Sequence, residues 1–148
     1  MMNFEETIAL ADKLMTKHGI SEKWVFHFDN AKRRLGKCNY SKKIISLSKH
    51  MIPLLERHEV EDTLLHEIAH ALVGKGHGHG MVWKAKAIEI GCNGERLYCG
   101  EARTKPKYKG TCPKCGKVIT RHRRKNISCG TCSRVFDKNL IFVWTINK

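Results

Sequence analysis

The sequence has no long apolar run and few acidic residues. The first shortage excludes a membrane-spanning helix, and the second leaves a strongly basic chain. No hydrophobic stretch approaches the roughly 18 residues that a membrane-spanning helix needs. The N-terminal stretch contains Glu5, Glu6 and Asp12 without an apolar core, so we expect no secretory signal. Only 14 acidic residues stand against 28 Lys and Arg, which gives a formal net charge of +14. A positive charge of this size suits a polyanion such as nucleic acid, or an anionic membrane surface.

The shortage of acidic residues is confined to the C-terminal third of the chain. The charges of residues 1–102 nearly balance, whereas Asp137 is the only acidic residue after residue 102. The change falls at residues 103–110, a basic stretch that contains Pro106 and Gly110 and is typical of a linker. We therefore predict a near-neutral domain over residues 1–104 and a strongly basic module over residues 105–148.

Hydrophobic periodicity predicts an α+β first domain. Apolar residues at helical spacing predict helices over 4–18, 59–73 and 82–90. Alternating or β-branched stretches predict strands over 24–28, 35–39 and 43–48. Pro53 is expected to open a further helix, because proline is favoured in the first helical turn. The expected architecture is a few helices against a small sheet.

The first chemical motif is His66-Glu67-Ile68-Ala69-His70, an HExxH sequence inside the predicted helix 59–73. Residues i and i+4 project from the same helix face, so the two imidazoles can bind one Zn²⁺. Glu67 then lies beside the metal, where it can act as general base on a metal-bound water. A catalytic zinc needs a third protein ligand, and the glycine-rich loop after the helix offers His77 or His79.

Several runs of this sequence resemble the SprT-like metalloprotease family, which includes proteases that clear DNA–protein crosslinks. The resemblance covers about residues 5–102, and its HExxH–loop–HGxxW pattern implies that His79 rather than His77 is the third ligand. It also implies a zincin-type fold and protein substrates that lie on DNA or are crosslinked to it. The runs that carry the resemblance are 64–71, 79–84, 24–26, 34–38 and 44–48.

The second motif is a pair of CxxC sequences separated by thirteen residues. Two such turns close a tetrahedral site with four thiolates, which leaves no position for water, so we expect a structural zinc in a zinc ribbon. Residues 140–144 are expected to form its closing strand. We expect the three other cysteines, Cys38, Cys92 and Cys99, to be buried thiols rather than ligands. The expected ligands are Cys112, Cys115, Cys129 and Cys132.

Basic residues lie before and between the two CxxC sequences and predict contacts with the phosphates of a nucleic acid. Tyr108, Phe136 and Trp144 are available to stack on bases, although the last two can equally pack inside the ribbon. The predicted nucleic-acid-binding residues are Lys105, Lys107, Lys109, Lys114, Lys117, Arg121, Arg123, Arg124 and Lys125.

Taken together, these features predict a monomeric zinc endopeptidase with one catalytic and one structural Zn²⁺. It would bind single-stranded or mixed DNA with low sequence specificity, cleave proteins on DNA and have no membrane partner. We expect it in the cytoplasm of a bacterial or phage-infected cell, at the nucleoid, or in a nucleus if it is eukaryotic. One alternative is a non-enzymatic nucleic-acid-binding protein whose HExxH zinc is structural. Another is a general zinc protease without a role on DNA.

Overall fold

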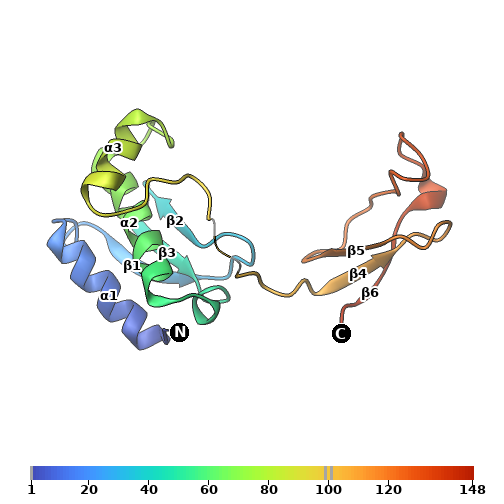
Figure 1. Ribbon diagram of the computed structural model, residues 1–148, viewed down its shortest axis with the longest axis horizontal. Coiled ribbons are helices and arrows are strands. Elements are labelled where there is room, and N and C mark those ends of the chain that lie inside the picture. Colours follow the sequence, from blue (N-terminus) through green and yellow to red (C-terminus); the bar gives the residue numbers. More distant parts are fainter. Residues whose placement is uncertain (1, 99, 101) are drawn as a thin grey trace. The chain divides into compact units, whose positions relative to one another are not determined.

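The computed structural model describes residues 2–98, 100 and 102–148 (Figure 1). The chain forms two compact units, Met1–Thr104 and Lys105–Lys148. Each unit has its own three-stranded sheet and its own cluster of buried side chains. Among the described residues, no helix is long and apolar enough to cross a lipid bilayer.

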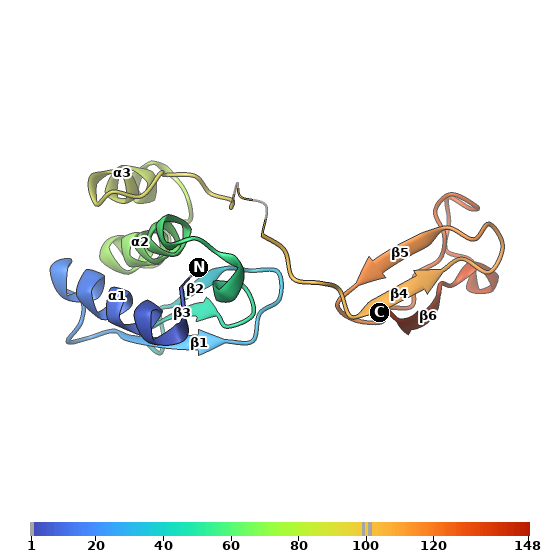
Figure 2. The same ribbon diagram turned by 60° about the horizontal axis from the view of Figure 1, so that its bottom comes forward.

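The first unit is an α+β layer structure. Its sheet has the order β1-β3-β2, in which β1 is parallel and β2 antiparallel to the central β3. Helices α1 and α2 cover one face of this sheet (Figure 2). In chain order the elements are α1 (Phe4–Lys17), β1 (Val25–Asp29), β2 (Gly36–Asn39), β3 (Ile44–Ser48), the 3₁₀ turn η1 (Ile52–Leu54), α2 (Arg57–Val73) and α3 (Met81–Glu89).

The core lies between α2 and the central strand. Ile45 and Leu47 of β3 are fully buried, as are Leu64 and Ile68 of α2. Burying one such side chain contributes about 1.5–3 kcal/mol, so this contact is a main source of stability for the unit. It also presses the helix that carries the HExxH motif against β2 and β3.

Local sequence signals define the ends of α2. A capping box links Glu56 and Glu59 at its N-terminus, where each side chain accepts a hydrogen bond from the other residue's backbone. Gly74 ends the helix with φ of 85°, a left-handed conformation that glycine adopts without strain. The loop that carries His79 therefore turns away from the helix directly after its last turn.

Two predicted elements differ from the structure. The helix expected at Pro53 is only the three-residue turn η1, because the chain becomes extended at Leu55. The closing strand expected over 140–144 begins later, at Val143, because Leu140 ends a 3₁₀ turn and is buried. Asp137 caps that turn by accepting a hydrogen bond from the Asn139 N–H.

The second unit is an antiparallel sheet of order β5-β4-β6 beside two cysteine turns. Its small core gathers Leu140 and Phe142 around Cys112 and Cys129. Gly110 lets the Trp144 indole lie against the sheet, because a Cβ there would come within 3.0 Å of that ring. The elements are β4 (Tyr108–Thr111), β5 (Val118–Arg121), the 3₁₀ turn η2 (Lys138–Leu140) and β6 (Val143–Ile146).

Candidate metal centres

Helix α2 holds both histidines of the HExxH motif on one side, and the loop before α3 brings a third to them. The Nε2 atom of His79 lies 3.0 Å from that of His66 and 3.1 Å from that of His70. A tetrahedral zinc with Zn–N bonds of about 2.0–2.1 Å places its nitrogen ligands about 3.3 Å apart. These three residues, the histidine cluster, therefore fit one zinc ion. His77 stays outside the cluster and is exposed.

The imidazoles of the cluster are kept neutral by their surroundings. Burial, and then the neighbouring histidines, lower the pKa of His66 and of His70 to about 4. Burial and the nearby Arg96 also lower the pKa of His79. A neutral imidazole has a free lone pair for a metal, so the arrangement favours metal binding over protonation at neutral pH.

The indole ring of Trp83 in α3 packs against all three rings of the histidine cluster. Its side chain is fully buried, and its ring centroid lies 4.5, 5.2 and 4.7 Å from those of His66, His70 and His79. The indole Nε1 donates a hydrogen bond to the His66 carbonyl oxygen at 3.2 Å. A residue buried in this way cannot contact a substrate, so we interpret Trp83 as the residue that positions the three imidazoles.

Glu67 lies on the side of α2 that faces the sheet, next to the histidine cluster. Its Oε1 atom is 4.0 Å from the Nε2 atom of His66, and the residue is 7% exposed. Burial raises the pKa of Glu67 to about 8, while Arg34 lowers it and Asp29 raises it. A divalent cation at the histidines would favour the carboxylate form, which is the form that can accept a proton.

Sequence reasoning missed Gly36, which makes room for Glu67. A Cβ at Gly36 would lie 3.0 Å from the Leu47 side chain, 3.1 Å from the Ser46 carbonyl oxygen and 3.2 Å from Cγ of Glu67. Strand β2 therefore approaches α2 closely at this point. The only signal in the sequence was a glycine within a predicted strand, which often marks a close approach of backbone.

Cys38 and Cys92 do not join either cluster. Burial, and then the nearby Glu67, raise the pKa of Cys38 to about 12, although a hydrogen bond with Tyr40 opposes this. Burial also raises the pKa of Cys92 to about 11. Both side chains are therefore protonated thiols at neutral pH and poor metal ligands. Cys99 lies outside the described residues.

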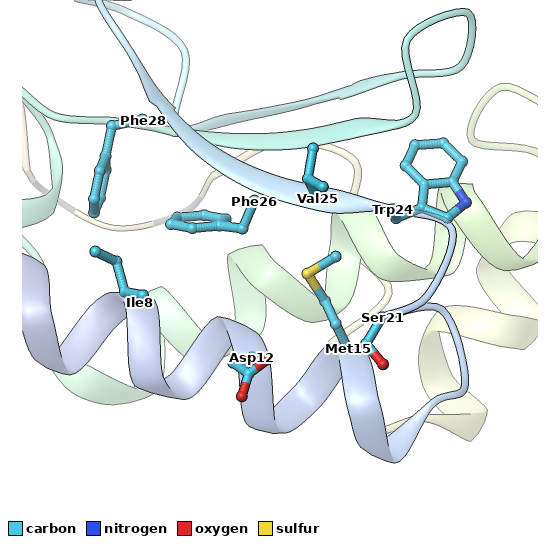
Figure 3. A pocket seen from close by; sticks show the side chains of 8 residues that line it. All are labelled: Ile8, Asp12, Met15, Ser21, Trp24, Val25, Phe26 and Phe28. Carbon is cyan, nitrogen blue, oxygen red and sulfur yellow. The ribbon is translucent and has the colours of Figure 1, made fainter.

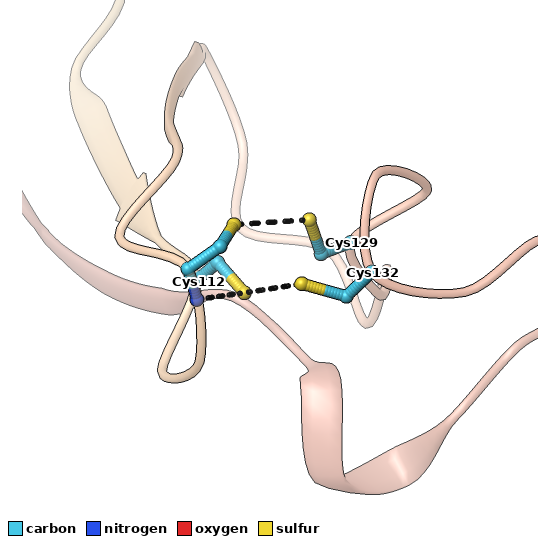
Figure 4. Close-up of side chains that lie close together, drawn as sticks. Cys112, Cys129 and Cys132 are labelled. Atoms are coloured by element: carbon cyan, nitrogen blue, oxygen red, sulfur yellow. Dashed lines mark hydrogen bonds between the residues drawn. The ribbon is translucent and has the colours of Figure 1, made fainter.

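The four cysteines of the CxxC pairs converge in the second unit (Figure 4). The Sγ atoms of Cys112 and Cys132 are 3.9 Å apart, and those of Cys115 and Cys129 are 3.7 Å apart. Both pairs are free thiols rather than disulfides. Four sulfur ligands at about 2.3 Å from a tetrahedral zinc lie about 3.8 Å from each other, so this cysteine cluster fits a closed structural zinc site.

All nine predicted nucleic-acid-binding residues are exposed. Lys107 and Arg124 lie over the Tyr108 ring, with the Lys107 Nζ at 5.6 Å and the Arg124 Cζ at 5.4 Å from its centroid. Arg121 pairs with Tyr108 across the strands and shares its face of the sheet, whereas Lys109 points to the other face. Basic residues therefore lie on both faces of this sheet.

The first unit has a zincin-like fold, and its histidine cluster lies on the central helix α2 and the loop that follows it. The fold resembles the metallopeptidase zymogen jannalysin of Methanocaldococcus jannaschii, with a TM-score of 0.51 and 15% identity over 64% of this chain and 88% of that one. The metallopeptidase zymogen abylysin of Pyrococcus abyssi has a TM-score of 0.46 and 18% identity over 64% and 82% of the two chains.

The family follows from the sequence itself. Residues 4–106 match the model of the SprT-like family, so the chain belongs to this family. No curated protein sequence matches the chain. Family and fold together support a metalloprotease with a bound metal, as the resemblance implied.

Proposed function

We propose that the chain is a zinc-dependent endopeptidase that binds DNA and cleaves proteins bound or crosslinked to it. One observation supports the peptidase most strongly: three neutral imidazoles converge on one point beside a buried glutamate. A structural zinc site would need the histidines but would have no use for this carboxylate. The glutamate therefore favours an enzyme over a protein that only binds nucleic acid.

The proposed reaction uses Glu67 twice. His66, His70 and His79 would hold the zinc, which supplies Lewis acidity to the scissile carbonyl and to the attacking water. The Glu67 carboxylate takes the proton of that water and passes it to the leaving amine nitrogen. Trp83 keeps the imidazoles oriented through its ring contacts and its hydrogen bond to the His66 carbonyl.

Strand β2 is the proposed binding edge for the substrate backbone. It lies at the edge of the first sheet, and Gly36 on this strand packs against Glu67. An extended peptide that adds to β2 would run past the general base, with its backbone held by hydrogen bonds and its side chains free to vary. This mode suits a protease with diverse protein substrates.

The second unit is the proposed DNA-binding part, and its aromatic residues have different roles. Trp144 donates its indole N–H to the Lys125 carbonyl at 2.9 Å and packs, partly buried, against the ribbon core. Tyr108 is covered by Lys107 and Arg124. Phe136, in contrast, is 64% exposed between Arg134 and Lys138 in sequence, so it is the aromatic residue best placed to stack on an unpaired base.

The test is cleavage of a basic DNA-binding protein by the zinc-loaded chain, with and without single-stranded DNA. We expect Glu67→Gln to lower kcat about 10²–10⁴-fold, because it removes the general base but leaves the ligands in place. His77→Ala, outside the histidine cluster, is the matched control and should cleave normally. Phe136→Ala should weaken binding of single-stranded DNA more than that of duplex DNA.

The possible results separate the hypotheses. Cleavage that requires both Glu67 and DNA supports a protease that acts on DNA. Cleavage that is indifferent to DNA, together with DNA affinity independent of salt, favours a general protease. DNA binding without any cleavage would contradict the enzymatic proposal and leave the HExxH zinc as a structural ion.

A further inference from the structure

Strand β1 forms the other edge of the first sheet, away from β2. No strand among the described residues pairs with its outer side. Its bonds to the β3 side include the Val25 N–H to the Lys43 carbonyl and the Lys49 N–H to the Asp29 carbonyl. Because backbone direction alternates along a strand, the N–H and C=O groups of Phe26 and Phe28 point to the open side. This edge can therefore pair with a further strand.

An apolar groove of about 320 Å³ lies between this strand and helix α1 (Figure 3). Ile8 and Met15 line it from the helix, and Phe26 and Phe28 line it from the strand. Ile8 is 50% exposed, whereas Met15, two turns further along the same side of the helix, is 3% exposed. The residues with free backbone groups thus also contribute the aromatic wall of the groove.

The helical rim of the groove is acidic, in contrast to the chain as a whole. Asp12 is the only charged residue that lines the groove, and it forms no ion pair with any described residue. Glu5 projects from the same side of α1 as Asp12, whereas Lys17 projects about 140° away around the helix, as follows from the helical repeat of 3.6 residues. An incoming segment would therefore gain from a positive charge opposite Asp12.

We propose that the β1 edge and this groove bind an extended basic segment of a protein substrate, which adds as a strand beside β1. Alternate side chains of such a strand would face α1, on the same side as Phe26 and Phe28. One apolar side chain would contact Ile8, and a Lys or Arg two residues away would reach Asp12. The aliphatic stem of that basic residue would cover the apolar wall.

The choice of a substrate as the partner rests on the proposed function, because proteins bound to DNA are rich in Lys and Arg. A second copy of the chain fits less well. If two copies paired through β1, each copy would offer the other's groove only the strand that carries Phe26 and Phe28. That strand would bring no Lys or Arg to Asp12. The Asp12 and Glu5 carboxylates of the two copies would also be brought close to each other, and like charges in proximity are unfavourable.

The test uses the full zinc-loaded chain with Glu67→Gln, so that no peptide is cleaved. Two capped heptapeptides serve as probes: Thr-Val-Thr-Lys-Thr-Val-Thr and the same peptide with Glu in place of Lys. Amide hydrogen exchange, read by NMR, should slow at Phe26 and Phe28 with the lysine peptide and less with the glutamate peptide. Asp12→Asn should weaken binding of the lysine peptide about threefold to tenfold. Glu6→Gln, at a carboxylate of α1 that does not line the groove, is the matched control and should leave it unchanged.

A second measurement identifies the partner. With an intact Glu67, Asp12→Asn should raise KM for a basic DNA-bound protein at least about threefold and leave kcat unchanged.

Equal binding of both peptides, or unchanged exchange at Phe26 and Phe28, overturns the groove as a binding site. Protection that grows with chain concentration alone assigns the edge to a second copy and also overturns it. Peptide binding with an unaltered KM overturns the substrate as partner. Absence of all cleavage contradicts only the proposed function, and the peptides still decide the role of the groove.

Discussion

At the scale of residues, the site depends on a close approach that only glycine permits. Gly36 lies against Leu47, the Ser46 carbonyl oxygen and Glu67, and all three are within 3.2 Å of where a Cβ would be. One of these neighbours is backbone, which cannot rotate away. The position of Glu67 relative to the histidine cluster therefore depends on the absence of a side chain on β2.

We expect Gly36→Ala to lower both stability and catalysis. The added methyl group must push β2 or Glu67 aside, and overpacking of this kind typically costs about 1–3 kcal/mol. Thermal unfolding and kcat for a protein substrate measure the two effects. Gly130→Ala is the control, since a Cβ there meets nothing within 4 Å. A Gly36→Ala chain with unchanged kcat would show that the close approach does not position the general base.

At the scale of elements, the N-terminus of α2 is held by a residue far along the chain. The Tyr98 hydroxyl donates a hydrogen bond to Oε2 of Glu59 at 2.6 Å, while Oε1 of Glu59 accepts one from the Glu56 N–H. The hydrogen bond from Tyr98 lowers the pKa of Glu59, although burial opposes this. The carboxylate form of Glu59 thus ties the segment after α3 to the start of the catalytic helix.

This arrangement predicts a pH-dependent contribution to stability. Because the pKa of Glu59 is lowered by folding, its contribution is present above the ordinary value of 4.5 and is lost as pH falls through the lower folded value. Glu59→Gln should therefore reduce the free energy of unfolding by about 1 kcal/mol or less at pH 7. The difference from the wild type should shrink below pH 4. Denaturant unfolding at the two pH values measures this, and an equal difference at both would contradict it.

At the scale of the whole molecule, each unit has its own source of stability. The first unit buries an extended apolar core, whereas the core of the second consists of few side chains around the cysteine cluster. A module of this size rarely folds on such a core alone, and a metal bound at the cysteine cluster would supply the missing free energy. Loss of one ligand should therefore unfold the ribbon and spare the first unit.

We expect Cys115→Ser to abolish ordered structure in residues 105–148 and to leave residues 4–98 folded. Amide NMR spectra distinguish the two units, and a chelator that removes the ribbon zinc should have the same effect. Cleavage of a short unstructured peptide should persist, while stimulation by DNA should disappear. Cys92→Ser, at a buried cysteine outside the cluster, is the control. A Cys115→Ser ribbon that remains folded would mean that the metal is not its main stabiliser.

The sequence by itself determined the features that depend on local spacing. The i, i+4 pair of HExxH and the two CxxC turns predict metal ligands, because neighbours along the chain fix their geometry, and the structure brings these side chains together. Helical periodicity likewise predicted α1, α2 and α3, and the charge count predicted where the basic module begins. The short turn at Pro53 was not predictable, because proline opens long and short helices alike.

Tertiary structure decided what depends on residues distant in sequence. It brought His79 rather than His77 to the pair on α2 and packed Trp83 against all three imidazoles. It also left Phe136 exposed, while Trp144 packs partly buried against the core of the second unit. It also brought Gly36 against Glu67 and opened the groove between α1 and β1. Each of these follows from how helices and strands pack, and packing combines side chains from many parts of the chain, which no local pattern can specify.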